Sequence, residues 1–240
     1  SHADPGADGG ADDGLERFLA AERALGSGDR ATFDALLSGL GDYPLYPYLR
    51  YAVLAADLAG ASDQAIEAFL ADFPATPLAE RLRGTYLGRL AAQGRWADYA
   101  RLYRPDDATE RRCLYLRALI ETGRGLEALT PTELEPLWLA PRSQPAACDP
   151  VFAAWTESGG LTEGLVWARI RLALEAGEPG LARYLGGRLA EPERPWLDLW
   201  LQVRARPELV LEPQSLAGEH PQKAAILAQE RLTASIGIGP

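Results

Sequence analysis

The feature of this sequence that most constrains its fold is a helical periodicity that stops, again and again, at a glycine. Four segments, "LGSGDRATFDALL", "LAAQGRWADYARLY", "LIETGRGLEAL" and "LEAGEPGLARYL", share this form, and their glycines are Gly28, Gly94, Gly123 and Gly177. Glycine permits the left-handed conformation that ends a helix and turns the chain back. The spacing is too irregular for a strict tetratricopeptide array. We therefore predict an all-α solenoid, or superhelix, of paired antiparallel helices with degenerate tetratricopeptide-like repeats.

Several of the expected helices have recognisable starts. Ser62 is placed as the N-cap of a helix that runs to Pro74, and Thr76 caps a helix with Pro77 in its first turn. Thr130 and Glu133 have the spacing of a capping box. Helical periodicity also covers residues 15–25, 28–40, 149–160, 164–177 and 222–233, and no alternating run of strand length stands out.

The stretch "GDYPLYPYLRY" at residues 41–51 contains four tyrosines and two prolines. It could form an aromatic platform for a ligand or a corner between helices. Pro44 ends any regular element that precedes it, and Pro47 suits the first turn of a new helix. Both prolines favour the corner. We expect the new helix to be largely buried, on a face formed by Tyr48, Tyr51, Ala52, Ala55 and Leu58 and widened by Leu49 and Val53.

The charge of the chain excludes two classes of partner. The formal net charge is −10 and the sequence contains no sizeable run of basic residues. A nucleic-acid-binding protein would need such a run to replace phosphate counterions, and an anionic membrane surface would repel this chain. No window approaches twenty apolar residues, so no membrane span is expected either.

Residues for catalysis, for a cofactor or for a metal are not found. The histidines are His2 and His220, too few for a nucleophilic triad or a zinc site, and no phosphate-binding glycine motif occurs. A glycosidase would need only two carboxylates. The acidic clusters, Asp106–Asp107 and Glu133 with Glu135, instead suit helix starts and solvated faces. We expect no catalytic, cofactor-binding or metal-binding residue here.

The tryptophans allow two interpretations. Trp96, Trp138, Trp155, Trp167, Trp196 and Trp200 could line a groove for sugars, but their spacing suits helix interiors. We expect most of them in the core, while one or two on a concave surface would suffice for a ligand.

The domain organisation is predicted from the composition of the chain and from the residues at its two ends. The chain contains no methionine, so we expect that it was processed or cut from something larger. Residues 1–14 are acidic and glycine-rich and are expected to be a disordered tail with an expression scar. Residues 15–240 are expected to form one α-superhelical domain that is truncated, because a solenoid normally ends in a polar capping repeat.

Cys113 and Cys148 are the two cysteines. Their positions alone leave two buried thiols and one disulfide equally open. A disulfide would place the protein in an oxidising compartment.

Two motifs resemble a known family. "LGDYPLYPYLRY" at residues 40–51 and "LWLAPRSQPAACDPVFAAW" at residues 137–155 resemble segments of the N-terminal, U-shaped superhelical domain of the soluble lytic murein transglycosylases. "FPATPLAERLR" and "GLVWARIRLALEAG" match more weakly. The resemblance covers roughly residues 15–205. It implies that Cys113 and Cys148 form the disulfide of that family, and that the protein is periplasmic, secreted across the inner membrane of a Gram-negative bacterium.

In that family, a lysozyme-like domain cleaves peptidoglycan with a single glutamate and yields a 1,6-anhydromuramoyl product. Its signature is Glu-Ser, a small residue and Phe, followed by a Gly-Leu-Met-Gln stretch. Here the pair Glu157–Ser158 is followed by Gly-Gly and is expected at a helix end, so the pair is read as coincidence.

The resemblance implies a non-catalytic scaffold domain of a periplasmic peptidoglycan lytic transglycosylase, with glycan strands or a linker or catalytic domain of the same protein as partners. The alternative is a free-standing helical-repeat adaptor that binds a periplasmic protein on its concave face. An autonomous glycosidase is the least favoured hypothesis.

Overall fold

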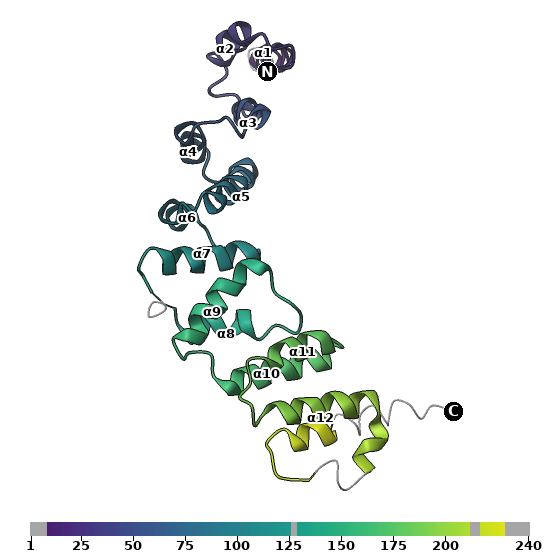
Figure 1. Cartoon of the computed structure of the whole chain (residues 1–240). Coiled ribbons are helices and arrows are strands. Elements are labelled where there is room, and N and C mark those ends of the chain that lie inside the picture. Colours follow the sequence, from purple (N-terminus) through teal and green to yellow (C-terminus); the bar gives the residue numbers. More distant parts are fainter. Residues whose placement is uncertain (1–8, 126–128, 212–216, 229–240) are drawn as a thin grey trace, which may run out of the picture. The chain divides into compact units, whose positions relative to one another are not determined.

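The structure is a computed structural model, and it describes residues 9–125, 129–211 and 217–228 (Figure 1). Within these ranges every regular element is a helix and no strand occurs. No helix in these ranges is long and apolar enough to cross a bilayer. The chain divides into two compact units, Ser1–Tyr103 and Arg104–Pro240, which are described separately.

The first unit is a succession of helix pairs. Its helices α1 and α2 pack together, α1 and α4 both contact α3, and α5 packs against α4 and α6. The bounds are α1 Gly9–Gly26, α2 Arg30–Leu37, α3 Tyr46–Ala56, α4 Asp63–Asp72, α5 Pro77–Ala92 and α6 Trp96–Leu102.

The second unit continues the pattern of paired helices, with one longer irregular segment. Here α7 packs against η2 and α9, and α11 packs against α10 and α12. The bounds are α7 Thr109–Glu121, α8 Pro131–Trp138, η2 Ala146–Cys148, α9 Asp149–Glu157, α10 Glu163–Glu175, α11 Pro179–Gly186, α12 Arg194–Ala205 and η3 Pro207–Leu211, and residues 223–228 are also helical.

The glycine prediction is confirmed at all four positions. The φ angles are +77° at Gly28, +67° at Gly94, +74° at Gly123 and +78° at Gly177. Three of these glycines lie in the turns that join α1 to α2, α5 to α6 and α10 to α11. Gly159, between α9 and α10, has the same conformation at +77°, although the sequence analysis did not single it out. The predicted all-α fold of paired helices is thus confirmed.

Two of the three predicted caps form. Ser62 and Thr76 each accept a hydrogen bond at 3.2 Å from the backbone N–H three residues ahead, and Pro77 opens α5. The capping box is wrong: Thr130 precedes α8, but its side chain makes no capping bond. The N–H of Glu133 donates instead to the backbone carbonyl of Thr130 at 2.9 Å. This N–H is therefore not available to the Thr130 hydroxyl, which a capping box would require.

The tyrosine-rich stretch is a corner, as predicted, since α3 begins there with Pro47 in its first turn. The predicted buried face is right only in part, since Tyr51, Ala52 and Leu58 are half-buried. Leu49 is the buried residue of α3, whereas Tyr48 is 54% exposed and Ala55 is exposed. Leu49 belongs to the core formed with α1 and α2, and Val53 packs against that core. Because α3 is apolar on several sides, its composition did not indicate which side its neighbours would cover.

The ends of the chain differ in part from expectation. Helix α1 begins at Gly9, so the predicted boundary after residue 14 falls inside a helix; residues 1–8 lie outside the described part. Residues 223–228 of the helix predicted over 222–233 are helical, with Ile226 buried. Gln222 lies in the turn before them, and residues 229–233 lie outside the described part. The assignment of residues 15–240 to one domain stays a prediction.

Candidate functional site

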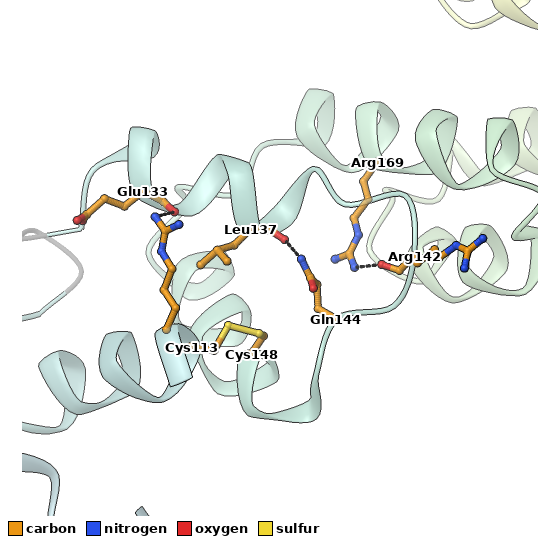
Figure 2. Close-up of a disulfide and its surroundings, with 8 residues drawn as sticks. Cys113, Glu133, Leu137, Arg142, Gln144, Cys148 and Arg169 are labelled. Atoms are coloured by element: carbon orange, nitrogen blue, oxygen red, sulfur yellow. Dashed lines mark hydrogen bonds between the residues drawn. A yellow bond between two sulfur atoms is a disulfide. The ribbon is translucent and has the colours of Figure 1, made fainter. Parts of the chain in front are cut away.

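The second unit carries the motif of residues 137–155, and a disulfide joins this motif to α7 (Figure 2). Cys113 is placed by α7 and Cys148 by η2, and the structure joins their sulfur atoms in a bond. Both residues are fully buried, with their Cα atoms 4.8 Å apart. The bond therefore connects α7 to the turn that leads into α9.

Side chains satisfy the backbone of the irregular segment between α8 and η2. Gln144 Nε2 donates to the carbonyl of Leu137 at 2.7 Å, and Arg169 of α10 donates from Nη2 to the carbonyl of Arg142 at 3.3 Å (Figure 2). The Nε of Arg169 also donates to the carbonyl of Ala140 at 3.3 Å. A carbonyl buried outside a helix needs such a partner. These contacts give the polar residues of the motif a role in holding the loop.

An aromatic cluster lies against the same segment. The Trp138 ring packs edge-on against Phe152 at 5.1 Å between centroids and against Trp155 at 6.5 Å. The guanidinium of Arg169 lies 4.6 Å from the centre of the Trp138 ring, and that of Arg188 lies 5.6 Å from it. The indole N–H donates to the carbonyl of Leu165 at 2.9 Å. The apolar body of Trp138 and its polar edge both have partners.

A pocket of about 400 Å³ opens beside this cluster. Its walls include aromatic rings, two guanidinium groups and one carboxylate, contributed by Trp138, Phe152, Arg169, Arg188 and Asp149. Burial lowers the pKa of Arg169, and the charge of Arg188 lowers it further, whereas Tyr184 and Asp149 act in the opposite direction. Even so, an arginine keeps its charge at neutral pH.

The tryptophans are mainly core residues, as predicted. Trp138, Trp155, Trp167 and Trp200 are buried, while Trp96 and Trp196 are half-buried. The concave-surface role for one or two of them stays a prediction.

His220 takes part in a structural cluster. Its Nε2 lies 2.8 Å from Glu193 Oε2, which also accepts from Trp167 Nε1 at 2.7 Å, and the ring stacks on Trp196 at 4.6 Å. The N–H of Gln222 donates to Nδ1, so in the neutral ring the proton lies on Nε2. Burial raises the pKa of Glu193, but the hydrogen bonds from Trp167 and His220 outweigh it and hold the pKa below its usual range. This cluster holds residues 217–228 against α10 and α12.

The acidic residues singled out from the sequence stay apart from the pocket. Asp106 and Asp107 are exposed, and Asp106 accepts from the N–H of Ala108 at 2.8 Å. Glu133 lies in the first turn of α8, and both Glu133 and Glu135 are half-buried. In the described ranges, no three His, Cys, Asp or Glu side chains are grouped as a metal site would require.

The Glu157–Ser158 pair lies at the end of α9, as predicted: Glu157 is the last residue of the helix, and Ser158 donates from Oγ to the carbonyl of Trp155 at 2.9 Å. Sequence reasoning missed the three charged residues of the pocket, Asp149, Arg169 and Arg188. The sequence signal for Arg169 was an arginine among the apolar residues that form the buried face of its helix.

Relatives of this chain are found among curated proteins. The chain is 32% identical over 180 residues to the soluble lytic murein transglycosylase of Escherichia coli strain K12, a match that covers 74% of this chain and 27% of that protein. It is 33% identical over 175 residues to the enzyme of the same name from Salmonella typhimurium, covering 72% and 27%. The chain thus spans about a quarter of the length of the curated relatives it matches.

Solved structures agree with these sequence matches. The 70 kDa soluble lytic transglycosylase in complex with bulgecin A has a TM-score of 0.74 and 27% identity, over 95% of this chain and 37% of that chain. An inactive mutant of the lytic transglycosylase Slt from Pseudomonas aeruginosa has a TM-score of 0.69 and 33% identity, over 89% and 34%. The resemblance inferred from the two sequence motifs is confirmed.

One family model, described as Cucumovirus coat protein, matches residues 95–206. This span is less than half of the 240 residues and carries no family assignment.

Proposed function

Because this chain is related in sequence and in fold to the soluble lytic murein transglycosylases, we propose that it is the superhelical scaffold domain of a periplasmic enzyme of that kind. In this proposal the chain does not cleave peptidoglycan itself. A lysozyme-like domain outside these 240 residues carries the catalytic glutamate, and the scaffold contacts that domain or a linker domain and shapes the access of glycan strands.

The observation that carries the proposal is how the family-like motif of residues 137–155 is used. Trp138 and Cys148 are buried, and Gln144 bonds the backbone of Leu137. These residues hold a loop and fill the core, and this structural role accounts for the motif without a catalytic role. A catalytic acid, by contrast, needs a carboxyl that faces a substrate cleft with its pKa raised, and Glu157 is an exposed residue at a helix end.

The periplasmic location has its own support. A disulfide between Cys113 and Cys148 is formed and kept in an oxidising compartment such as the bacterial periplasm. We propose that this bond exists in the native protein. Thiol titration of protein purified from periplasm without reductant tests it: no free thiol should react before reduction, and two should react afterwards.

Digestion of isolated sacculi, with chromatography and mass spectrometry of the released muropeptides, tests the non-catalytic role. The chain alone should release no 1,6-anhydro products, while the E. coli soluble lytic murein transglycosylase, as a positive control, should release them. Anhydro products from this chain alone would overturn the proposal.

A second test separates the scaffold from an independent adaptor. The native gene is sequenced beyond the codon for Pro240. A reading frame that continues into a Glu-Ser-small-Phe motif supports the scaffold proposal. A stop codon directly after Pro240 contradicts it and favours a free-standing helical-repeat protein.

A further inference from the structure

Two arginines converge on one tryptophan in the pocket of the second unit, and neither is in direct contact with a described carboxylate. Arg169 of α10 lies 4.6 Å and Arg188, which follows α11, lies 5.6 Å from the centre of the Trp138 ring. Neither forms an ion pair with any described residue, although the chain carries a net charge of −10. In the first unit, Arg95 and Arg101 each pair with two carboxylates. The pocket therefore holds two guanidinium groups that no described carboxylate contacts within ion-pair distance.

The hydrogen bonds of the two groups leave donors unused. Arg169 is 4% exposed, with Nε and Nη2 bonded to loop carbonyls; its Nη1 has no hydrogen-bond partner within the described part of the chain. Arg188 donates from Nη1 to Thr156 Oγ1 at 3.0 Å. Enclosing one guanidinium beside another is unfavourable, and cation–π contact with Trp138 offsets only part of that cost. An anion in the pocket would satisfy both the charge and the free donors.

The shape of the pocket suits a small organic molecule. Its volume of about 400 Å³ is in the range of small-ligand sites. Apolar surface comes from Trp138, Phe152 and Leu181, and polar groups come from Ser143, Gln144 and Tyr184. The ligand should combine a charged end with a short apolar body.

The carboxylate of Asp149 decides which anion fits best. It lies in the same pocket, is exposed and forms no ion pair with a described residue. Its charge reduces the net charge of the site from two positive charges to about one, which favours a monoanionic carboxylate over a phosphate dianion. It also offers a partner to an ammonium group. We propose that this pocket binds a small zwitterion, an amino acid or a short peptide, with its carboxylate on Arg169 and Arg188 and its ammonium towards Asp149.

This site goes beyond the scaffold role and does not depend on it. A binding experiment on the isolated chain addresses it without any assay of glycan cleavage, so the two proposals can fail separately.

The test is isothermal titration calorimetry with a dipeptide, two relatives that each lack one of its charges, and inorganic phosphate. Alanylalanine is used in its L,L and D,D forms, because charge pairing does not select between them. N-acetylated alanylalanine lacks the ammonium, alanylalanine amide lacks the carboxylate, and inorganic phosphate lacks the apolar body. At least one dipeptide form should bind, the N-acetylated form more weakly, and the amide should lose at least about tenfold in affinity.

Matched variants locate the site. Arg188→Gln should weaken dipeptide binding at least about tenfold, since a charged hydrogen-bond donor is removed. Arg183→Gln removes the same charge from an exposed residue of α11 outside the pocket and should leave binding unchanged. Thermal unfolding confirms that both variants are folded. The indole N–H signal of Trp138 should shift on titration in the NMR spectrum of the wild-type chain.

Three results would overturn the proposal. One is no binding of either dipeptide form at concentrations up to about 20 mM. Another is equal binding of the dipeptide, its amide and phosphate. The last is an equal loss of affinity in Arg183→Gln and Arg188→Gln, which would reflect net charge and not this pocket.

Discussion

The guanidinium of Arg169 lies 4.6 Å from the centre of the Trp138 ring, and the same group donates hydrogen bonds to the carbonyls of Ala140 and Arg142. One buried side chain of α10 thus holds both the end of α8 and the loop that follows it. This relationship makes Arg169 a stability determinant of the second unit, apart from any role in binding.

We therefore predict that Arg169→Met destabilises the chain by about 2–4 kcal/mol, because two loop carbonyls lose charged donors that methionine cannot replace. Urea unfolding followed by circular dichroism measures the change. Arg183→Met, an exposed change on α11, is the control and should stay within about 0.5 kcal/mol of wild type. Equal effects of the two substitutions would contradict this role for Arg169.

The Cys113–Cys148 bond closes a long loop, with a sequence separation of 35. Reduction should destabilise the chain by roughly 3–4 kcal/mol in the chain-entropy model, because the unfolded chain regains the freedom of that loop. Urea midpoints with and without dithiothreitol measure the effect. A variant with both cysteines changed to alanine should show no response to dithiothreitol, and an unchanged midpoint for the wild-type chain would refute the prediction.

A pair of glycines around the end of α5 should respond to alanine in opposite directions. Gly94 has φ +67°, where an L-residue is strained, so Gly94→Ala should cost about 1–2 kcal/mol. Gly88 lies within α5 and a Cβ there would meet nothing within 4 Å, so Gly88→Ala should stabilise by about 0.5–1 kcal/mol. Thermal unfolding of the two variants decides, and a shift of the same sign in both would contradict the turn geometry.

Asp63 should make part of the stability of the first unit dependent on pH. A hydrogen bond from Arg95 lowers its pKa, burial opposes the shift, and bonds from Tyr86 and Arg89 add to the lowering. Because the folded-state pKa lies below the unfolded value of about 3.9, the stabilisation is present above that value and is lost as the pH falls through the folded pKa. Asp63→Asn should therefore lower the urea midpoint at pH 7 but have a smaller effect near pH 3.

The control for Asp63 is Asp34→Asn, which removes an exposed pair between Arg30 and Asp34. Exposed pairs of this kind contribute little, so its effect should be small at both pH values. If Asp63→Asn lowers the urea midpoint equally at pH 7 and pH 3, the charge of Asp63 is not the cause of the destabilisation.

Local features of the sequence determined the helices and the places where they turn. Apolar periodicity and N-cap residues such as Ser62 and Thr76 act over a few positions, and the strain of a positive φ selects glycine at Gly94 and Gly177 from backbone sterics alone. These effects depend on no distant partner, so they could be predicted without a structure.

Only the tertiary structure decided which apolar side of a helix is covered and which charges meet. Leu49, and not Tyr48, is buried in α3 because α1 and α2 supply the core on that side. Arg169 reaches carbonyls 27 and 29 positions away, and no local pattern specifies that contact. The pocket exists because packing brings α8 to α11 together, and long-range packing of this kind is what the order of residues along one helix does not encode.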